Sequence, residues 1–320
     1  MILRDRPSGF QLFFIIRGSI LTRIWRVLLV NVVLATLVTW SDGDIYSRKI
    51  TLTAIPFTLI GLPLAIFLGF RNTAAYDRYV EGRKLWGEIV LRSRNLARQC
   101  LSLIPAAATE GQLPPVGGGA ATLADLRGRM VYRTIAYVHA LRHQLRDTDA
   151  QADLRGLLRP VEWQQAARAS RPAEYLMQQM GQDLRECLAR RALDGCLAAT
   201  IDGSLSALVS AAASCERIKG TPIPFSYSLM LHRTAYLYCF LLPFGLVDTT
   251  GFMTPFVVGI VAYTFFGLDA LGDEIEEPFG NSPNDLALDA ISRSAEISLR
   301  DALGEDHGLQ PLQPVDFCLT

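Results

Sequence analysis

The feature that most constrains this chain is an apolar run that continues without a break into a charged helix. Residues 50–70 form a run of 21 residues without a charge, and RNTAAYDRYVEGRKLW follows directly, with no Pro or Gly between Gly69 and Gly82. About 20 apolar helical residues are enough to cross the hydrocarbon core of a bilayer. The pattern therefore predicts one helix that crosses a membrane and continues into water.

Three further stretches have the composition of membrane spans. Thr249–Leu268 has 20 residues without a charge, and Val27–Trp40 and Thr234–Val247 have 14 each. The two shorter stretches also suit buried helices of soluble proteins, but flanking basic side chains can extend a short span by snorkelling. A mean hydropathy of +0.23 and a hydrophobic content of 50% agree with a membrane protein. We expect four membrane helices.

The distribution of basic residues predicts the orientation of these helices, because short cytoplasmic segments carry an excess of Lys and Arg. Basic residues cluster before the first span and after the second, whereas the links at the other ends are short. They are Arg4, Arg6, Arg17, Arg23, Arg26, Arg71, Arg78, Arg83, Lys84, Arg92 and Arg94. We expect both termini in the cytoplasm, with no cleaved signal peptide.

Three- and four-residue spacing of apolar side chains through the rest of the chain predicts helices, so the fold class is all-α. The expected order is a cytoplasmic N-terminal region, two membrane helices, a cytoplasmic helical domain, two more membrane helices, a helix returning to the domain, and a tail. Their bounds are 1–26, 27–70, 71–222, 223–272, 273–303 and 304–320. The six cysteines have no CxxC spacing, which favours reduced thiols over a disulfide framework or a zinc site.

Several functional classes have little support. The net charge of +0 gives no basic surface for nucleic acid. His139 and His143 have the i, i+4 spacing of metal ligands but no third ligand nearby, so we expect an interfacial pair. The acidic stretch LGDEIEEPFG could bind a cation, but we expect it to meet neighbouring arginines instead. No catalytic motif, cofactor fingerprint or mid-membrane charge indicates an enzyme or a transporter, and we expect no cofactor and no metal.

A stripe of large apolar residues follows one side of the second span. Leu62, Ile66 and Phe70 are spaced by four residues, so they lie on one narrow face of a helix. Gly61 and Gly69 flank the stripe and permit close helix contact, and Pro63 can bend the helix. In a symmetric ring of subunits the stripe would form stacked apolar collars, which gate by dewetting. Alternatively, the three side chains pack against a neighbouring helix.

The sequence at this stripe resembles the bacterial branch of the bestrophin family of ion channels. The resemblance rests on LPLAIFLGFRNTAAYDRYVEGRKLWG (62–87), on CERIKGTPIPFSYSLMLHRT (215–234) and on EEPFG (276–280). It implies a homopentamer in a lipid bilayer, the inner membrane of a bacterium, with one axial pore for small ions. The family's hydrophobic neck corresponds to Leu62, Ile66 and Phe70, and this agreement favours collars over internal packing. A cytoplasmic aperture in the family corresponds to Met180.

One part of the family pattern is missing here. Animal members carry a run of acidic residues after PFG that binds calcium, whereas this chain has NSPNDLALD, with only Asp285 and Asp289 close by. Calcium requires six to eight oxygen ligands. We therefore expect a channel that is not activated by calcium.

The sequence leaves the permeant ion open. The resemblance implies chloride, but Asp42, Asp44 and Asp248 in the outer links could concentrate cations, so a sodium or potassium channel is the alternative. Below the stripe, Asp77, Arg78 and Glu81 are expected to form structural ion pairs. A membrane scaffold or enzyme that conducts no ions is the remote alternative.

Overall fold

The computed structural model describes residues 1–3, 9, 15, 18–41, 44–45, 48–49, 53–105 and 125–320. The all-α prediction is confirmed, because the only strands among these residues are a two-residue antiparallel pair, β1 (Asp44–Ile45) and β2 (Arg48–Lys49). The described helices are α2 (Leu21–Trp40), α3 (Ala54–Leu103), α5 (Leu126–Arg146), α6 (Gln151–Leu157), α7 (Pro160–Arg168), α8 (Pro172–Ala189), α9 (Gly195–Gly220), α10 (Phe225–Thr250), the 3-10 turn η1 (Gly251–Met253), α11 (Thr254–Glu276) and α12 (Leu288–Ala302).

The chain divides into two compact units. The first, called the span unit, comprises Ile2–Val80 and Thr221–Pro278. The second, called the charge-rich unit, comprises Met1, Glu81–Gly220 and Phe279–Thr320. The α3 helix has 50 residues and contributes its first part to the span unit and the remainder to the charge-rich unit. The predicted unbroken helix is therefore confirmed, and Pro63 lies inside it.

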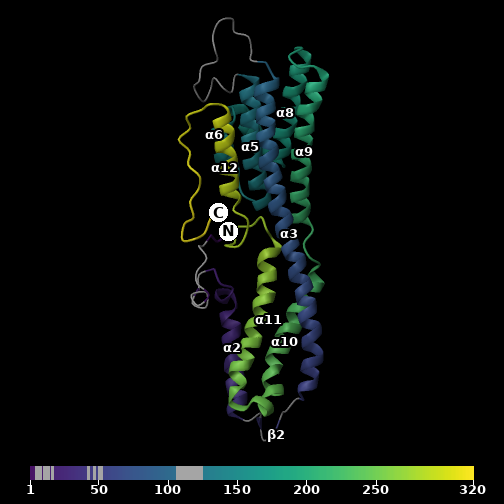
Figure 1. Cartoon of the computed structure of the whole chain (residues 1–320), viewed down its shortest axis with the longest axis vertical. Helices are drawn as coiled ribbons and strands as arrows, with labels where there is room; N and C mark the ends of the chain where they lie inside the picture. The colour runs from purple at the N-terminus through teal and green to yellow at the C-terminus, as the bar shows by residue number, and fades with distance from the viewer. Residues whose placement is uncertain are drawn as a thin grey trace. The chain divides into compact units, whose positions relative to one another are not determined.

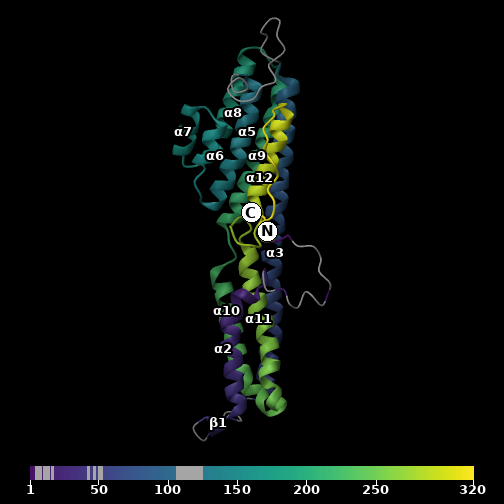
Figure 2. The ribbon, with the colours of Figure 1, turned by 90° about the vertical axis from the view of Figure 1, so that its left-hand side faces the viewer.

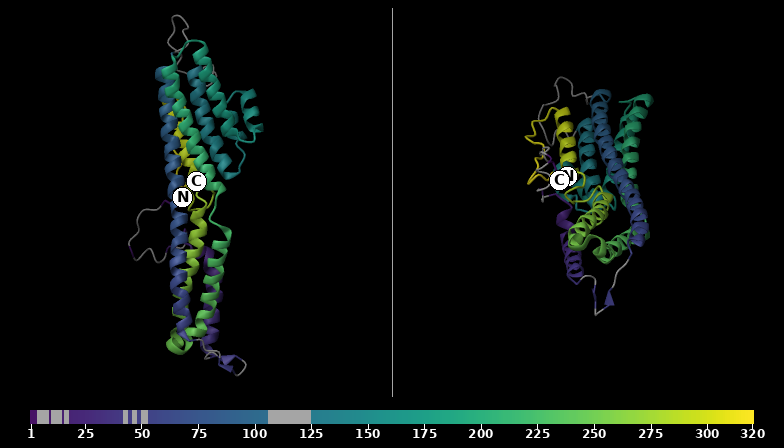
Figure 3. Two further views of the ribbon diagram at one scale, coloured as in Figure 1. Left: turned by 90° about the vertical axis from the view of Figure 1, so that its right-hand side faces the viewer. Right: turned by 60° about the horizontal axis from the view of Figure 1, so that its bottom comes forward.

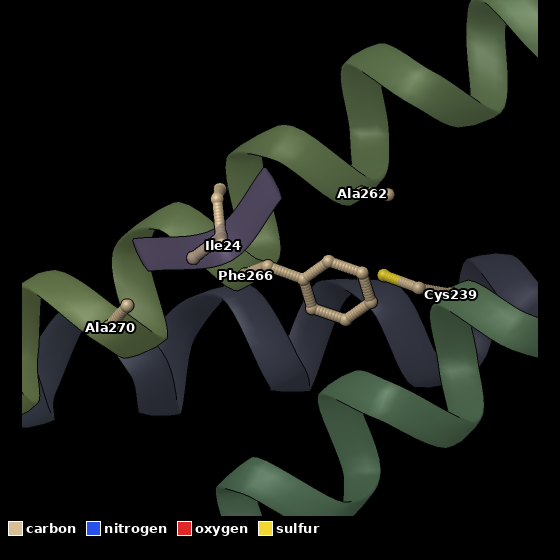
Figure 4. Close-up of a cluster of buried hydrophobic side chains, with 5 residues drawn as sticks. All are labelled: Ile24, Cys239, Ala262, Phe266 and Ala270. Atoms are coloured by element: carbon tan, nitrogen blue, oxygen red, sulfur yellow. The ribbon is translucent and has the colours of Figure 1, made fainter. Parts of the chain in front are cut away.

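In the span unit, α2, α10 and α11 run side by side with the first part of α3 (Figure 1). Their core contains Ile24, Cys239, Ala262, Phe266 and Ala270, and Figure 4 shows the Phe266 ring pointing toward the Cys239 side chain. The small side chains of Ala262 and Ala270 leave room for this ring between the helices. Asn31, the buried polar residue of α2, donates to the carbonyl oxygen of Cys239 at 2.9 Å.

Close contact at Gly61 joins α3 to α10. A Cβ atom on Gly61 would lie 2.9 Å from the Tyr238 hydroxyl oxygen, so only glycine fits without displacing that ring. The prediction that Gly61 permits close helix contact is confirmed. Gly69 differs, because a Cβ atom there would meet nothing within 4 Å.

The turn between the last two apolar helices lies three residues later than predicted. The sequence placed the link near Asp248, but α10 continues to Thr250 and ends at Gly251, whose φ of 52° is in the left-handed region. Glycine adopts this conformation without a steric penalty. Pro255 then lies in the first turn of α11, where its missing N–H group costs nothing.

The charge-rich unit is built around α5, which contacts α6, α8, α9 and α12 (Figures 2 and 3). Most of α5 is buried, including charged residues such as Arg133 and His139. After α12 the tail from Gly304 is mostly irregular. The two ends of the chain meet in this unit, where the Leu319 amide donates to the carbonyl oxygen of Met1 at 2.8 Å.

Four helical segments among the described residues are long and apolar enough to cross a membrane: Leu21–Trp40, Ile55–Leu103, Gly195–Gly220 and Phe225–Glu276. The last contains both α10 and α11. Three of the four segments include three of the predicted spans and residues 55–70 of the span predicted over 50–70. The fourth is α9, which the sequence analysis assigned to the cytoplasmic domain. It packs against α5 and α8 within the charge-rich unit.

Candidate functional site

The first part of α3 has one face packed against the span unit. Phe57, Leu64, Leu68, Arg71 and Ala75 are all buried on this face. Leu64 lies in a cluster with Leu231 and Ala235 of α10. At about 100° per residue, the five buried side chains fall within a sector of roughly 60°. This sector fixes how α3 is rotated within the unit.

The predicted stripe lies on the opposite side of α3. Leu62, Ile66 and Phe70 are 66%, 47% and 63% exposed, and they point about 180° away from the buried sector. Among the described residues, no helix of the same chain covers them. Packing within the chain, the alternative left open by the sequence, is therefore excluded for this conformation. The stripe must face lipid, water or another copy of the chain.

Polar residues continue this exposed face after Phe70. Thr73 and Asp77 are both exposed and lie on the same side of α3 as Ile66 and Phe70. The Thr73 hydroxyl donates to the carbonyl oxygen of Gly69 at 3.0 Å and so stays close to the helix. An apolar stripe that ends in a carboxylate is unusual for a surface that contacts only lipid.

A buried cluster of charges lies directly behind the end of the stripe. Arg71 is 2% exposed, and its guanidinium donates to Asp269 at 2.9 Å and to Asp273, with Glu276 at 3.6 Å. Asp269 also contacts the His232 ring nitrogen Nδ1 at 2.7 Å. These residues join α3, α10 and α11 at one level. The prediction that the LGDEIEEPFG stretch meets a neighbouring arginine is confirmed.

Gly272 makes room for this cluster. A Cβ atom at Gly272 would lie 2.5 Å from Oδ1 of Asn72 and 3.4 Å from the Arg71 guanidinium. The absence of a side chain therefore allows α3 to approach α11 where Arg71 reaches its carboxylate partners. The acidic stretch predicted a neighbouring arginine but did not identify Arg71, and Asp269 was not among the predicted partners. Asp269, Asp273 and Glu276 are spaced at i, i+4 and i+7 and so lie on one helix face, which is the sequence signal for a shared cationic partner.

The three residues expected to form ion pairs below the stripe have different environments. Glu81 pairs with Arg217 at 2.6 Å within the charge-rich unit. Arg78 donates to two main-chain oxygens, that of Glu276 at 3.0 Å and that of Thr221. Asp77 is exposed. The ion pair expected for Asp77 stays a prediction.

Met180 occupies the core of the charge-rich unit and does not face solvent. Its side chain is 0% exposed, and the Thr134 hydroxyl lies 3.5 Å from its sulfur. A side chain without exposed surface cannot line an aqueous aperture. The expectation at Met180 is corrected for this reason: its helix, α8, turns this position toward α5.

His139 and His143 share the carboxylate partner Asp153. The Oδ2 atom of Asp153 lies 2.9 Å from His143 Nε2 and 3.6 Å from His139 Nδ1, and Glu296 lies 3.1 Å from His139 Nε2. The hydrogen bond with His143 is the main reason that the pKa of Asp153 lies well below its usual range. Burial raises the pKa of Glu296, but His139 and the nearby arginines outweigh burial and lower it. Among the described residues, no group of three or more His, Cys, Asp or Glu side chains could hold a metal ion.

The acidic residues after PFG already form hydrogen bonds or ion pairs within the chain. Asp285 accepts a hydrogen bond from the Ser282 amide at 2.6 Å, and Asp289 pairs with Arg146 at 2.8 Å and with Arg142 at 3.2 Å. Of the outer acidic residues, Asp42 lies outside the described residues, Asp44 is described only by its backbone pairing in β1, and Asp248 is exposed in the last turn of α10.

Comparison of the chain with known proteins identifies its family. The family model described as "Bacterial/Fungal Bestrophin protein" matches residues 1–301. A voltage-dependent anion channel-forming protein of Mesorhizobium japonicum is 43% identical over 95% of this chain and 93% of its own length, and one of Escherichia coli K12 is 36% identical over 93% of each. A crystal structure of a bestrophin homologue from Klebsiella pneumoniae is 38% identical, with a TM-score of 0.80 over 88% of this chain and 99% of that one. Together with its apolar helices, these matches identify an integral membrane protein, and the chain belongs to the bacterial and fungal bestrophin family.

Proposed function

We propose that this chain forms an anion channel, in which copies of α3 surround an axial pore and Leu62, Ile66 and Phe70 form its neck. The observation that carries this proposal is the exposure of the three side chains on the face of α3 opposite its packed side. The resemblance to bestrophins supports a pentamer, and the names of the relatives support anions as the permeant ions.

A neck of this kind controls flow through hydration. Three stacked apolar collars offer no hydrogen bonds to water, so a narrow passage between them dries easily and resists ions. Leu62, Ile66 and Phe70 rise about 6 Å per step along α3, which gives a neck about 12 Å long. The collars carry no charge, so they set the conductance of the pore more than its preference for one ion.

The Arg71 cluster supplies rigidity behind the neck. Phe70 and Arg71 are adjacent in α3, and Arg71 is tied to α11 through Asp269 and Asp273. A buried arginine with several carboxylate partners holds its helix in one rotation, because turning α3 would leave charges unpaired. The cluster thus keeps the Phe70 ring directed away from the span unit.

A monovalent cation channel is the second candidate, and Asp77 is the observation that favours it. This carboxylate is exposed on the same face as the neck, so a symmetric ring of copies would place a ring of negative charge just beyond Phe70. Such a ring raises the local concentration of Na⁺ or K⁺ and repels chloride. We favour an anion channel over this cation alternative because the relatives of the chain are named anion channel-forming proteins.

Opening without calcium is part of the proposal. Asp285 and Asp289 have few free oxygen ligands, because one accepts from a main-chain amide and the other pairs with two arginines. A calcium site there would have to break these contacts and recruit several more oxygens.

We also propose that α2, the first part of α3, α10 and α11 cross a bacterial inner membrane with both termini in the cytoplasm. In this proposal α9 does not cross the membrane and lies in the cytoplasm with the rest of the charge-rich unit.

Current measurements on the purified protein in a planar bilayer test the proposal. With a NaCl gradient, an anion channel reverses near the chloride equilibrium potential, whereas a shift to the sodium value establishes the cation alternative. Absence of any ion flux in proteoliposomes would instead favour a scaffold or an enzyme. Micromolar calcium should leave the open probability unchanged, and a steep rise would refute the calcium-independent part.

A further inference from the structure

The N-terminal end of α2 carries a group of side chains that the neck does not use. Arg23, Trp25 and Arg26 are exposed, Trp25 to 50%, and the Arg26 guanidinium carbon lies 5.5 Å from the centre of the Trp25 ring. Arg23 and Arg26 are three residues apart and so are neighbours on the helix surface. We call Arg23, Trp25 and Arg26 the α2 basic site.

The same side of α2 continues as an apolar surface. Val30, Val33 and Leu37 follow Arg26 at intervals of three and four residues and are 54%, 49% and 54% exposed. Ile24, on the opposite side, is buried in the core with Phe266 (Figure 4). Within the span unit, this surface therefore has no helix of the same chain against it among the described residues.

The length of α2 brings Arg26 to the level of lipid headgroups. Trp40, 87% exposed, ends the helix, and the 14 steps from Arg26 to Trp40 correspond to about 21 Å. A bilayer hydrocarbon core is about 30 Å thick. With Trp40 at one interface, the Arg26 guanidinium must reach toward the other interface, where Trp side chains such as Trp25 are also favoured.

The guanidinium groups of Arg23 and Arg26 lack an ion-pairing carboxylate among the described residues. An arginine at the edge of the hydrocarbon layer strongly favours an anionic partner. The required ligand has a negative charge at one end and hydrocarbon at the other, because the apolar surface continues directly from the charged one. Free phosphate satisfies only the first condition.

We propose that the α2 basic site binds the phosphate headgroup of an anionic phospholipid, whose acyl chains lie along Val30, Val33 and Leu37. Arg23 and Arg26 donate hydrogen bonds to the phosphate oxygens, since a guanidinium matches that geometry. The Trp25 ring lies at the headgroup level and holds Arg26 in place through its cation–π contact. This site is separate from the neck on α3, so it does not depend on which ions pass.

Native mass spectrometry of the full chain tests the site. The protein is released from mixed micelles with equal amounts of phosphatidylglycerol and phosphatidylcholine, and the ratio of the two bound lipids is measured. A basic residue near a membrane surface contributes about 1 kcal/mol of attraction. The preference for phosphatidylglycerol should therefore fall about 5-fold in Arg23→Gln or Arg26→Gln and about 30-fold in the double variant. Arg168→Gln on α7 makes the same charge change in the charge-rich unit and should retain the parent ratio.

An unchanged lipid ratio in the double variant, or an equal fall of this ratio in Arg168→Gln, would overturn the proposal. A smaller assembly in the double variant would also overturn it, because this face would then be a subunit contact. Displacement of the lipid by inorganic phosphate at constant ionic strength would show a free-anion site instead. The parent protein provides a measurement that needs no variant. Brominated phosphatidylglycerol should quench its tryptophan fluorescence more than brominated phosphatidylcholine, and equal quenching would count against the site.

Discussion

Replacing Arg71 by methionine should destabilise the span unit strongly. Arg71 is 2% exposed and lies against two carboxylates, with a third at 3.6 Å, while Asp269 is 3% exposed. Methionine preserves most of the side-chain volume but removes the positive charge. Of its side-chain partners among the described residues, Asp269 then keeps only His232, at 2.7 Å, and it lies in a buried environment.

The size of the effect follows from the burial of the pair. Breaking a buried ion pair by removing one partner costs about 3–5 kcal/mol, because the other charge stays buried and unpaired. A protein of about 150–250 residues loses roughly 2–4 °C in melting temperature per kcal/mol. For a transition of that size, Arg71→Met should lower the melting temperature by roughly 6–20 °C.

Thermal unfolding of the detergent-solubilised protein, followed by tryptophan fluorescence, measures this loss. Arg92→Met on the same helix is the matched control, because its pair with Glu88 is partly exposed and contributes well below 1 kcal/mol. Arg71→Met combined with Asp269→Asn should be less damaging than the two single changes added together, with a coupling of about 0.5–3 kcal/mol. Two results would refute this reasoning: a loss of melting temperature in Arg71→Met no larger than that in Arg92→Met, or a loss of stability in the double variant equal to the sum of the two single losses.

Four further predictions concern the neck, the face below it and the charge-rich unit. Phe70→Ala should raise the single-channel current severalfold by widening an apolar collar, whereas Val33→Ala on α2 should leave it unchanged; equal currents in parent and Phe70→Ala would contradict the neck. Asp77→Asn should raise the permeability of chloride relative to sodium, measured from reversal potentials, and an unchanged ratio would mean that Asp77 does not face the pore. Met180→Ala should cost about 2–5 kcal/mol in stability and leave conductance unchanged, since Met180 is fully buried; a changed conductance with normal stability would restore it as an aperture residue. The lowered pKa of Asp153 gives stability that is present above its ordinary value of 3.8 and lost as pH falls through the folded-state value, so the parent should lose melting temperature below about pH 4 and Asp153→Asn should lose less over that range.

Much of the span unit could be predicted because its helices obey simple periodic rules. The uncharged run before Arg71 predicted a membrane helix, and the absence of a breaker predicted that α3 continues into the charged segment. The four-residue spacing predicted that Leu62, Ile66 and Phe70 share a face. Spacing alone could not determine which face packs, because Phe57, Leu64 and Leu68 are equally apolar and occupy the other side.

The sequence could not predict which residues of two distant segments pair with each other. Arg71 and Asp269 are 198 residues apart, and only the packing of α3 against α11 brings them together. Met180 illustrates the reverse problem. Its helix has an apolar face, and the sequence does not show whether that face meets α5 or an open channel; the structure shows that it meets α5.

The most direct test of a pore lined by α3 is the accessibility of position 66 to a membrane-impermeant thiol reagent during current recording. A cysteine at this position, introduced as Ile66→Cys, should lose most of its current when the reagent is applied, because the reagent would block the neck. Val33→Cys, on the exposed surface of α2, and the parent with its own six cysteines should keep their current. Unchanged current in Ile66→Cys, with the reagent shown by mass to be attached, would contradict a pore lined by α3.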